Sequence, residues 1–206
     1  MSYSNFRLGE LVGQFDLVLE DRVDLFEAIA EIEPSPRCQI DLADNVPLAI
    51  AINTEKARSE LIVLPVLLEL RRYFDRRISL FSGVEFSIDP ERGLTGFCDF
   101  LISANPEQLL VRAPVAIGVE AKNGNVPSGL GQCAAELVAA QIFNQRAGNG
   151  VESVLGVVTT GTAWQFLRLT GRRLAIDLRE YSIERTGKIL GILASGVGES
   201  GQLDLQ

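Results

Sequence analysis

The segment Val115 to Val119 is apolar at every position, which is typical of a strand buried on both faces inside an α/β sheet. Two charged residues, Glu120 and Lys122, follow it almost directly. Because side chains alternate along a strand, we expect both to point to the same face, above small residues that leave room for them. Charges at the edge of a buried strand cost free energy unless they are paired, hydrated or bound to a metal. This strand end is therefore the first candidate for a functional site.

The chain before this strand predicts helices and two further strands. Apolar residues recur at helical spacing over 5–13 and 21–31. A short extended piece is expected at 15–19, and the proline-containing residues 33–37 should interrupt any helix. A longer helix should begin at Asn53 or Thr54, both good N-cap types, and continue to residue 74. Pro65 lies inside that helix and should kink it or shift its course. Strands are expected at 79–88 and 94–103, separated by turn-forming residues.

After the strand at 115–119, we expect an alanine-rich helix over 129–147. Two strands, 153–160 and 163–170, follow around a turn at Gly161, and a last helix covers roughly 183–194. This order predicts an α/β fold with a central mixed β-sheet flanked by helices on both sides. We expect a single domain over residues 1–206, in which 1–52 form an N-terminal helical extension and 198–206 a disordered tail.

Composition removes several classes of chemistry. The chain has no histidine, which excludes histidine-dependent catalytic triads, imidazole bases and histidine-ligated metals. Its three cysteines, Cys38, Cys98 and Cys133, form no CxxC pattern, so neither a zinc site nor a disulfide framework is expected. Any catalysis must use carboxylates, lysine, hydroxyls, thiols or a bound metal ion.

The charge and hydropathy of the chain limit its partners. A net charge of −8 argues against a protein that coats nucleic acid through a basic surface, although a local basic groove remains compatible with it. The longest apolar run, residues 61–68, is too short to cross a bilayer, and the N-terminus lacks a signal-peptide pattern. We therefore expect a cytoplasmic protein with no membrane partner.

Four side chains are out of character with their apolar surroundings: Asp99, Glu120, Lys122 and Glu60. Each has an ordinary explanation: an aspartate bonded to backbone amides, an ion pair, and a glutamate favoured near a helix start by about 0.3–1 kcal/mol. Together they suggest a hard-cation site, because Mg²⁺ typically uses one or two protein carboxylates plus water. Asp99 and Glu120 would supply the carboxylates and the Ala121 backbone carbonyl a further oxygen. Lys122 would position a water or neutralise a phosphate oxygen.

Asp99 followed, after residues 100–119, by Glu120-Ala121-Lys122 resembles the motif of the PD-(D/E)XK nuclease superfamily. The resemblance implies a restriction-endonuclease-like core of helix, three strands, helix and strand over residues 53 to about 170. It also implies that Glu60 joins the site from the preceding helix and that Gln132 binds substrate or steadies Lys122. The sequence departs from the family at Cys98, where a proline is common, and at Glu136, where an aromatic residue often follows the glutamine.

Longer runs, including NTEKARSEL, GFCDF, VEAKN and GLGQCAAELVAAQIFN, resemble a group of uncharacterised cyanobacterial proteins, a likeness that implies no activity. The superfamily resemblance implies a Mg²⁺-dependent endonuclease, with Mn²⁺ able to substitute, that hydrolyses DNA. Two alternatives stay open at this point: a catalytically silent fold that binds a protein partner, and a cleavage subunit that relies on another protein for its target. A homodimer is expected by analogy, since cutting a duplex requires two cuts.

Overall fold

The computed structural model describes residues 2–22 and 24–199. The tail predicted for 198–206 lies outside the described residues from position 200 onward, and Gly198 is the last residue of helix α6 (Thr186–Gly198).

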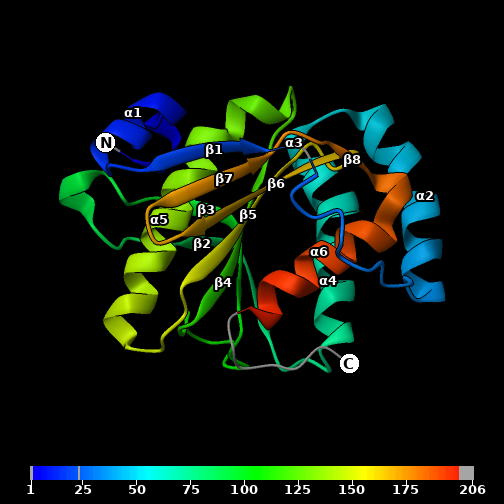
Figure 1. Ribbon diagram of the computed structural model, residues 1–206. Coiled ribbons are helices and arrows are strands. Elements are labelled where there is room, and N and C mark those ends of the chain that lie inside the picture. Colours follow the sequence, from blue (N-terminus) through cyan, green and yellow to red (C-terminus); the bar gives the residue numbers. More distant parts are fainter. Residues whose placement is uncertain (1, 23, 200–206) are drawn as a thin grey trace.

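The described residues form one eight-stranded mixed sheet (Figure 1). From edge to edge it contains β1 (Val18–Arg22), β7 (Arg173–Asp177), β6 (Ala163–Thr170), β5 (Ser153–Thr159), β4 (Val115–Ala121), β3 (Phe97–Ser103) and β2 (Ser79–Glu85). The short strand β8 (Tyr181–Ser182) pairs with β6. The β4–β5 and β1–β7 pairs are parallel and the others antiparallel. Strands β4 and β5 are almost wholly buried, as the apolar run at 115–119 predicts.

Helices cover both faces of this sheet, which confirms the expected α/β class (Figure 1). One face packs against α5 (Leu130–Ala147), with α1 (Leu8–Gln14) beside it. The other face packs against α4 (Leu64–Tyr73) and α6, with α2 (Pro36–Ile52) outside them. Short 3-10 turns occupy Tyr3–Asn5, Pro90–Arg92, Val126–Gly129 and Ile183–Arg185. In the described part of the chain, no helix is both long and apolar enough to span a membrane.

The long helix predicted from residue 54 is confirmed, and a π-helical turn interrupts it just before Pro65. Thr54 caps it by accepting a hydrogen bond from the Ala57 amide at 3.1 Å. The helix then runs through α3 (Glu55–Arg58), a π-helical turn (Ser59–Val63) and α4. Because Pro65 has no N–H, it is tolerated in the first turn of α4, directly after the wider turn.

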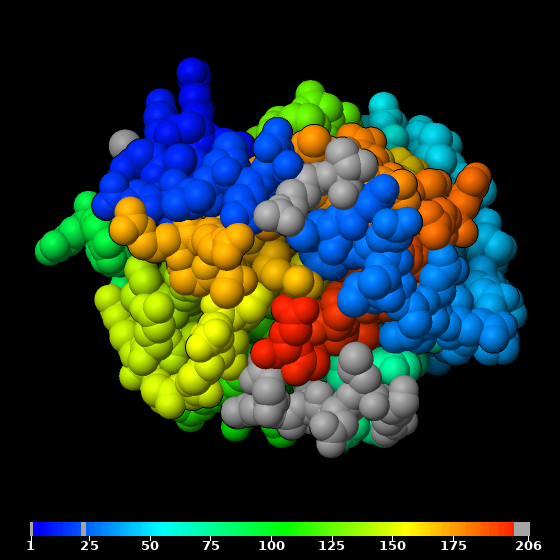
Figure 2. Space-filling model, in the orientation of Figure 1, coloured from blue at the N-terminus to red at the C-terminus, as the bar shows by residue number. Residues whose placement is uncertain are grey.

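The helix predicted at 21–31 is wrong for the part that the structure describes. Residues 21 and 22 belong to β1, residues 25–28 form a turn, and Asp24 has a left-handed backbone with φ of 62°. The ammonium of Lys188 takes the carbonyls of Glu27 and Ile29 as acceptors, so tertiary contacts replace helical bonds there. Figure 2 shows this blue segment lying against the orange and red C-terminal elements.

Helix α2 lies in the part of the chain expected to be helical, but its bounds were not predicted, because residues 33–37 suggested only a helix-breaking segment. Ser35 is in fact its N-cap and accepts from the Cys38 amide at 3.3 Å, and Pro36 occupies the first turn, where proline is well tolerated. Strands β7 and β8 were also missed. The three cysteines are buried and free, in agreement with the absence of a disulfide framework.

Candidate functional site

The candidate site lies where strands β3 and β4 stop pairing. Their ladder runs from Ser103 opposite Val115 to Phe100 opposite Val119 and ends there. Beyond it, the Asp99 carboxylate accepts a hydrogen bond from the Ala121 amide at 2.8 Å, in place of a backbone carbonyl. Asp99 thus has the ordinary structural role considered in the sequence analysis, that of an aspartate bonded to a backbone amide. The same bond holds its carboxylate beside the end of β4.

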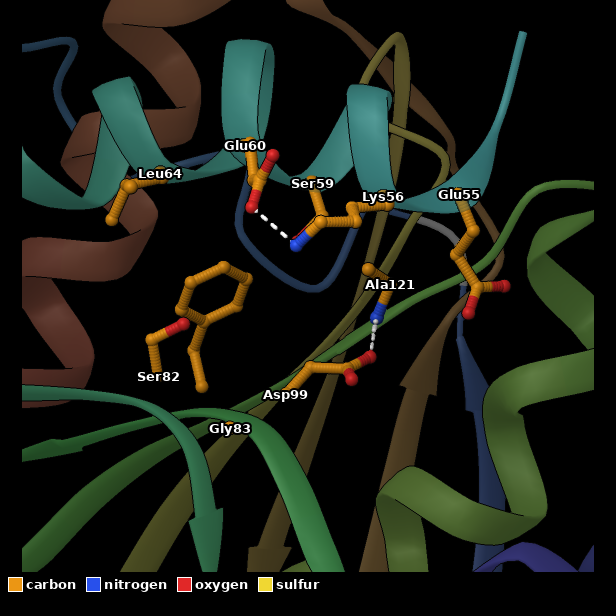
Figure 3. Close-up of a pocket in the computed structure, with 10 residues that line it drawn as sticks. Glu55, Lys56, Ser59, Glu60, Leu64, Ser82, Gly83, Asp99 and Ala121 are labelled. Atoms are coloured by element: carbon orange, nitrogen blue, oxygen red, sulfur yellow. Dashed lines mark hydrogen bonds and ion pairs between the residues drawn. The ribbon is translucent and has the colours of Figure 1, made fainter.

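A pocket of about 300 Å³ opens over Asp99 (Figure 3). The helix that carries Glu55, Lys56 and Glu60 forms one wall, and β2, β3 and the end of β4 form the other. Its lining residues are Glu55, Lys56, Ser59, Glu60, Leu64, Ser82, Gly83, Asp99, Phe100 and Ala121. Lys56 forms an ion pair with Glu60 at 2.6 Å across the exposed rim. The structure therefore places Glu60 at the pocket, opposite Asp99, and gives it a lysine partner on its own helix.

Glu120 and Lys122 point to the same face, as strand alternation predicts, and form an ion pair with each other. They are not among the residues that line the pocket. Glu120 is 2% exposed, whereas the Lys122 side chain retains 21%. Gln132 on α5 completes the group: its Nε2 donates to Glu120 Oε2 at 2.8 Å, and its Oε1 accepts from Lys122 Nζ at 3.3 Å.

Glu136, one turn further along α5, is a buried acid that the sequence reasoning noted only as a departure from the family pattern. It is 0% exposed, and its Oε1 accepts from Gln132 Nε2 at 3.2 Å. The room expected above Gly118 is filled from α5: a methyl group added at Gly118 would lie 3.6 Å from Leu137 and 3.8 Å from Glu136 Oε2. The sequence contained a sign of this buried acid, because Glu136 interrupts an alanine-rich helix segment that is otherwise apolar from 133 to 140.

The ionisation of the site follows from its burial. Burial, and then the Asp99 charge, raises the pKa of Glu120 to about 7, against the opposing effect of Lys122. Burial and the Glu120 charge raise the pKa of Glu136 well above its usual value. Burial also raises the pKa of Asp99, although the Ala121 amide and Lys122 oppose it. For Lys122, burial acts to lower the pKa, but its hydrogen bond to Glu120 and the nearby carboxylates raise it overall.

Glu55 is a further acidic residue that the sequence reasoning missed. It lines the pocket, and its charge acts on both Asp99 and Lys122. The pocket lining thus contains the carboxyl groups of Asp99, Glu55 and Glu60 and the ammonium of Lys56, while Lys122 pairs with Glu120 beside it. This excess of negative charge favours a bound cation. A signal was present in its position, since Glu55 directly follows the N-cap of the same helix.

The residues fit a hydrated Mg²⁺ better than a dehydrated, fully caged ion. Within residues 2–22 and 24–199, no three acidic or cysteine side chains converge as a ready metal cage. Mg²⁺ keeps several waters and needs only one or two carboxylates, however. Asp99 uses only Oδ2 for a hydrogen bond among the described residues, which leaves Oδ1 for a cation. Glu120 does not line the pocket, and each of its oxygens already accepts one hydrogen bond, from Lys122 or from Gln132.

Asp99, Glu120, Lys122 and Gln132 are therefore brought together by contact or by charge, while Glu60 stands across the pocket with Lys56. A scan of the sequence against protein-family models gave no match, and a search of curated proteins gave none either.

Proposed function

We propose that this protein is a metal-dependent endonuclease that hydrolyses DNA phosphodiester bonds, with a restriction-endonuclease-like core. The observation that supports the proposal most is the meeting of Asp99, Glu120 and Lys122 at the open end of β3 and β4, beside an acidic pocket. Two carboxylates and an ammonium group from neighbouring strands are the parts that metal-assisted phosphoester hydrolysis requires, and none of them is histidine.

In this proposal, Asp99, Glu120 and the Ala121 carbonyl would hold Mg²⁺ or Mn²⁺. The bound ion would polarise a phosphoryl oxygen and lower the pKa of water. Glu60 adds a carboxylate from the opposite wall, where it can orient a water or a second cation.

Lys122 and Gln132 act on the reacting groups around this ion. With a cation bound, Glu120 would share its carboxylate between the ion and Lys122, and the Lys122 ammonium would donate to the attacking water or to a phosphate oxygen. Gln132 keeps Lys122 near the pocket through its Oε1. In this proposal the Lys122 ammonium is held beside the pocket by two acceptors, Glu120 and Gln132.

The charge of the protein bears on how DNA would be bound. With a net charge of −8 and an acidic pocket, binding of a polyanion depends on the metal ion and on local cationic groups. This favours a cleavage subunit that receives its target from a second, DNA-recognising protein, or a homodimer that holds the two strands of a duplex.

The test is cleavage of plasmid and oligonucleotide DNA with Mg²⁺ or Mn²⁺, comparing the wild type with Lys122→Ala. Lys56→Ala is the control for charge, because it removes the ammonium that lines the pocket, and Lys56 pairs with Glu60 rather than with Glu120 or Gln132. We expect Lys122→Ala to abolish metal-dependent cleavage and Lys56→Ala to reduce it far less. Equal cleavage by the wild type and Lys122→Ala would rule the assignment out.

A second function is favoured by one observation: both oxygens of Glu120 are already engaged, by Lys122 and Gln132, in a closed buried network. Such a site suits a catalytically silent module that binds a protein partner. Calorimetry with Mg²⁺ and Mn²⁺ separates the two functions. No metal binding, together with a stable stoichiometric protein complex, would support the silent module.

A further inference from the structure

Glu136 is a buried carboxyl group to which the proposed reaction assigns no role. It belongs to a helix face built from Cys133, Ala134, Leu137 and Ala140, all fully or almost fully buried. A polar group at such a place costs free energy unless its hydrogen bonds are satisfied. One oxygen of Glu136 accepts from Gln132, the carboxyl group also interacts with that of Glu120, and Oε2 has no further hydrogen-bond partner in the described residues. An apolar residue would fill this position at lower cost.

The contacts of Gln132 indicate how Glu136 acts on the site. The amide has a donor end and an acceptor end, and the site presents carboxyl oxygens to one and an ammonium to the other. Nε2 faces Glu120 Oε2 and Glu136 Oε1, and Oε1 faces Lys122 Nζ. The reversed amide would set its oxygen against two carboxyl groups and its NH₂ against the ammonium.

Glu136 becomes more important when Glu120 also binds a cation. Once Glu120 turns towards a cation, its hold on Gln132 Nε2 is weakened. Glu136 Oε1 lies outside the pocket and still accepts from that NH₂ group. The acceptor end of Gln132 therefore stays directed at Lys122 when the cation binds.

We propose that Glu136 is a positioning residue that fixes the orientation of the Gln132 amide and thereby holds Lys122 and Glu120 in place for metal binding and cleavage. The proposal rests on the proposed nuclease function. It assigns Glu136 no contact with substrate or metal and requires only its hydrogen-bond acceptor.

The experiment compares Glu136→Leu, which removes the acceptor, with Glu136→Gln, which keeps one. Val154→Ala is the stability control, because Val154 is buried in the same core cluster but lies near the opposite end of β5. Each protein is measured by Mn²⁺ calorimetry without DNA, by metal-dependent oligonucleotide cleavage, and by crystallography of the metal-free form.

We expect Glu136→Leu to weaken Mn²⁺ binding and to lower kcat by about 10- to 100-fold, as partners of metal-site residues commonly do, with little change in KM. Its Gln132 amide should be displaced from Glu120 in the crystal. Glu136→Gln should restore most of both losses, and Val154→Ala should keep wild-type values. In a Gln132→Leu background, replacing Glu136 should have little further effect.

Wild-type Mn²⁺ affinity and kcat in a folded Glu136→Leu protein would overturn the inference, as would a Glu136→Gln variant that behaves like Glu136→Leu. Should Glu136→Leu fail to fold, Glu136→Met, whose flexible apolar side chain adapts to irregular space, takes its place. A wild type that binds Mn²⁺ but cuts no DNA contradicts the nuclease function alone, because the calorimetric comparison still decides the role of Glu136. A wild type that does neither overturns both.

Discussion

Replacing Glu120 by glutamine should change how the stability of the protein depends on pH. Glu120 is almost completely buried, and burial followed by the Asp99 charge raises its pKa from 4.5 to about 7. In the unfolded chain this carboxyl should titrate near its ordinary value. Between pH 4.5 and 7 the folded state therefore binds a proton that the unfolded state has released. The stability from this group is fully present below pH 4.5 and is lost as the pH rises to about 7.

The size of the effect follows from the same values. A pKa difference of one corresponds to about 1.4 kcal/mol, so the interval from 4.5 to about 7 corresponds to a loss of roughly 3 kcal/mol. The raised pKa values of Asp99 and Glu136 have the same sign and add to the fall. Glu69 acts in the opposite direction at lower pH, because its lowered pKa gives stability that is lost as the pH falls.

The assay is urea unfolding in the presence of EDTA at pH 5, 6, 7 and 8. We expect the free energy of unfolding of the wild type to fall across this range, and that of Glu120→Gln to fall by roughly 2 to 3 kcal/mol less, because part of the loss has already occurred at pH 5. Glu60→Gln is the matched control, because the Glu60 side chain is 55% exposed at the pocket rim. Parallel curves for the wild type and Glu120→Gln would refute the argument that burial of this carboxyl governs the slope.

Three further predictions concern packing and metal binding. Gly131→Ala should lower the melting temperature and expose the N-terminal segment to protease, because its methyl group would lie 2.3 Å from the Phe6 carbonyl oxygen; an unchanged melting curve would contradict this. Mn²⁺ at 100 times its Kd should stabilise the wild type by about 2.7 kcal/mol but leave Asp99→Ala unaffected, and equal stabilisation in calorimetry would exclude Asp99 as a ligand. Lys188→Met should cost about 1–3 kcal/mol in urea unfolding by leaving the Glu27 and Ile29 carbonyls unpaired, and an unchanged free energy of unfolding would contradict this.

Much of the fold could be predicted from local pattern. Thr54 begins the long helix because a threonine side chain can cap it, and residues 129–147 form α5 because they combine helix-forming residues with a buried face. Asp99 and Glu120 could be placed together because β3 and β4 are neighbours along the chain and pair antiparallel. The shared face of Glu120 and Lys122 follows from the alternation of side chains in a strand.

Other features depended on contacts between distant parts of the chain. Residues 24–31 have a helical pattern, but Lys188, more than 150 residues away, binds the carbonyls that a helix would use itself. Strand β1 finds its parallel partner in β7, and Glu55 acts on Asp99 only because the α3 helix packs over the sheet end.

The sequence alone was sufficient to indicate which side chains are out of place in a core and which short segments become helices or strands, because those properties depend on side-chain chemistry and on neighbours a few residues apart. Only the tertiary structure decided how the charged groups are paired. It buried Glu120 between Lys122 and Gln132, and it placed Glu136 behind them. The free energy of a buried charge depends on every group packed around it, and those groups come from separate elements that the fold alone brings together.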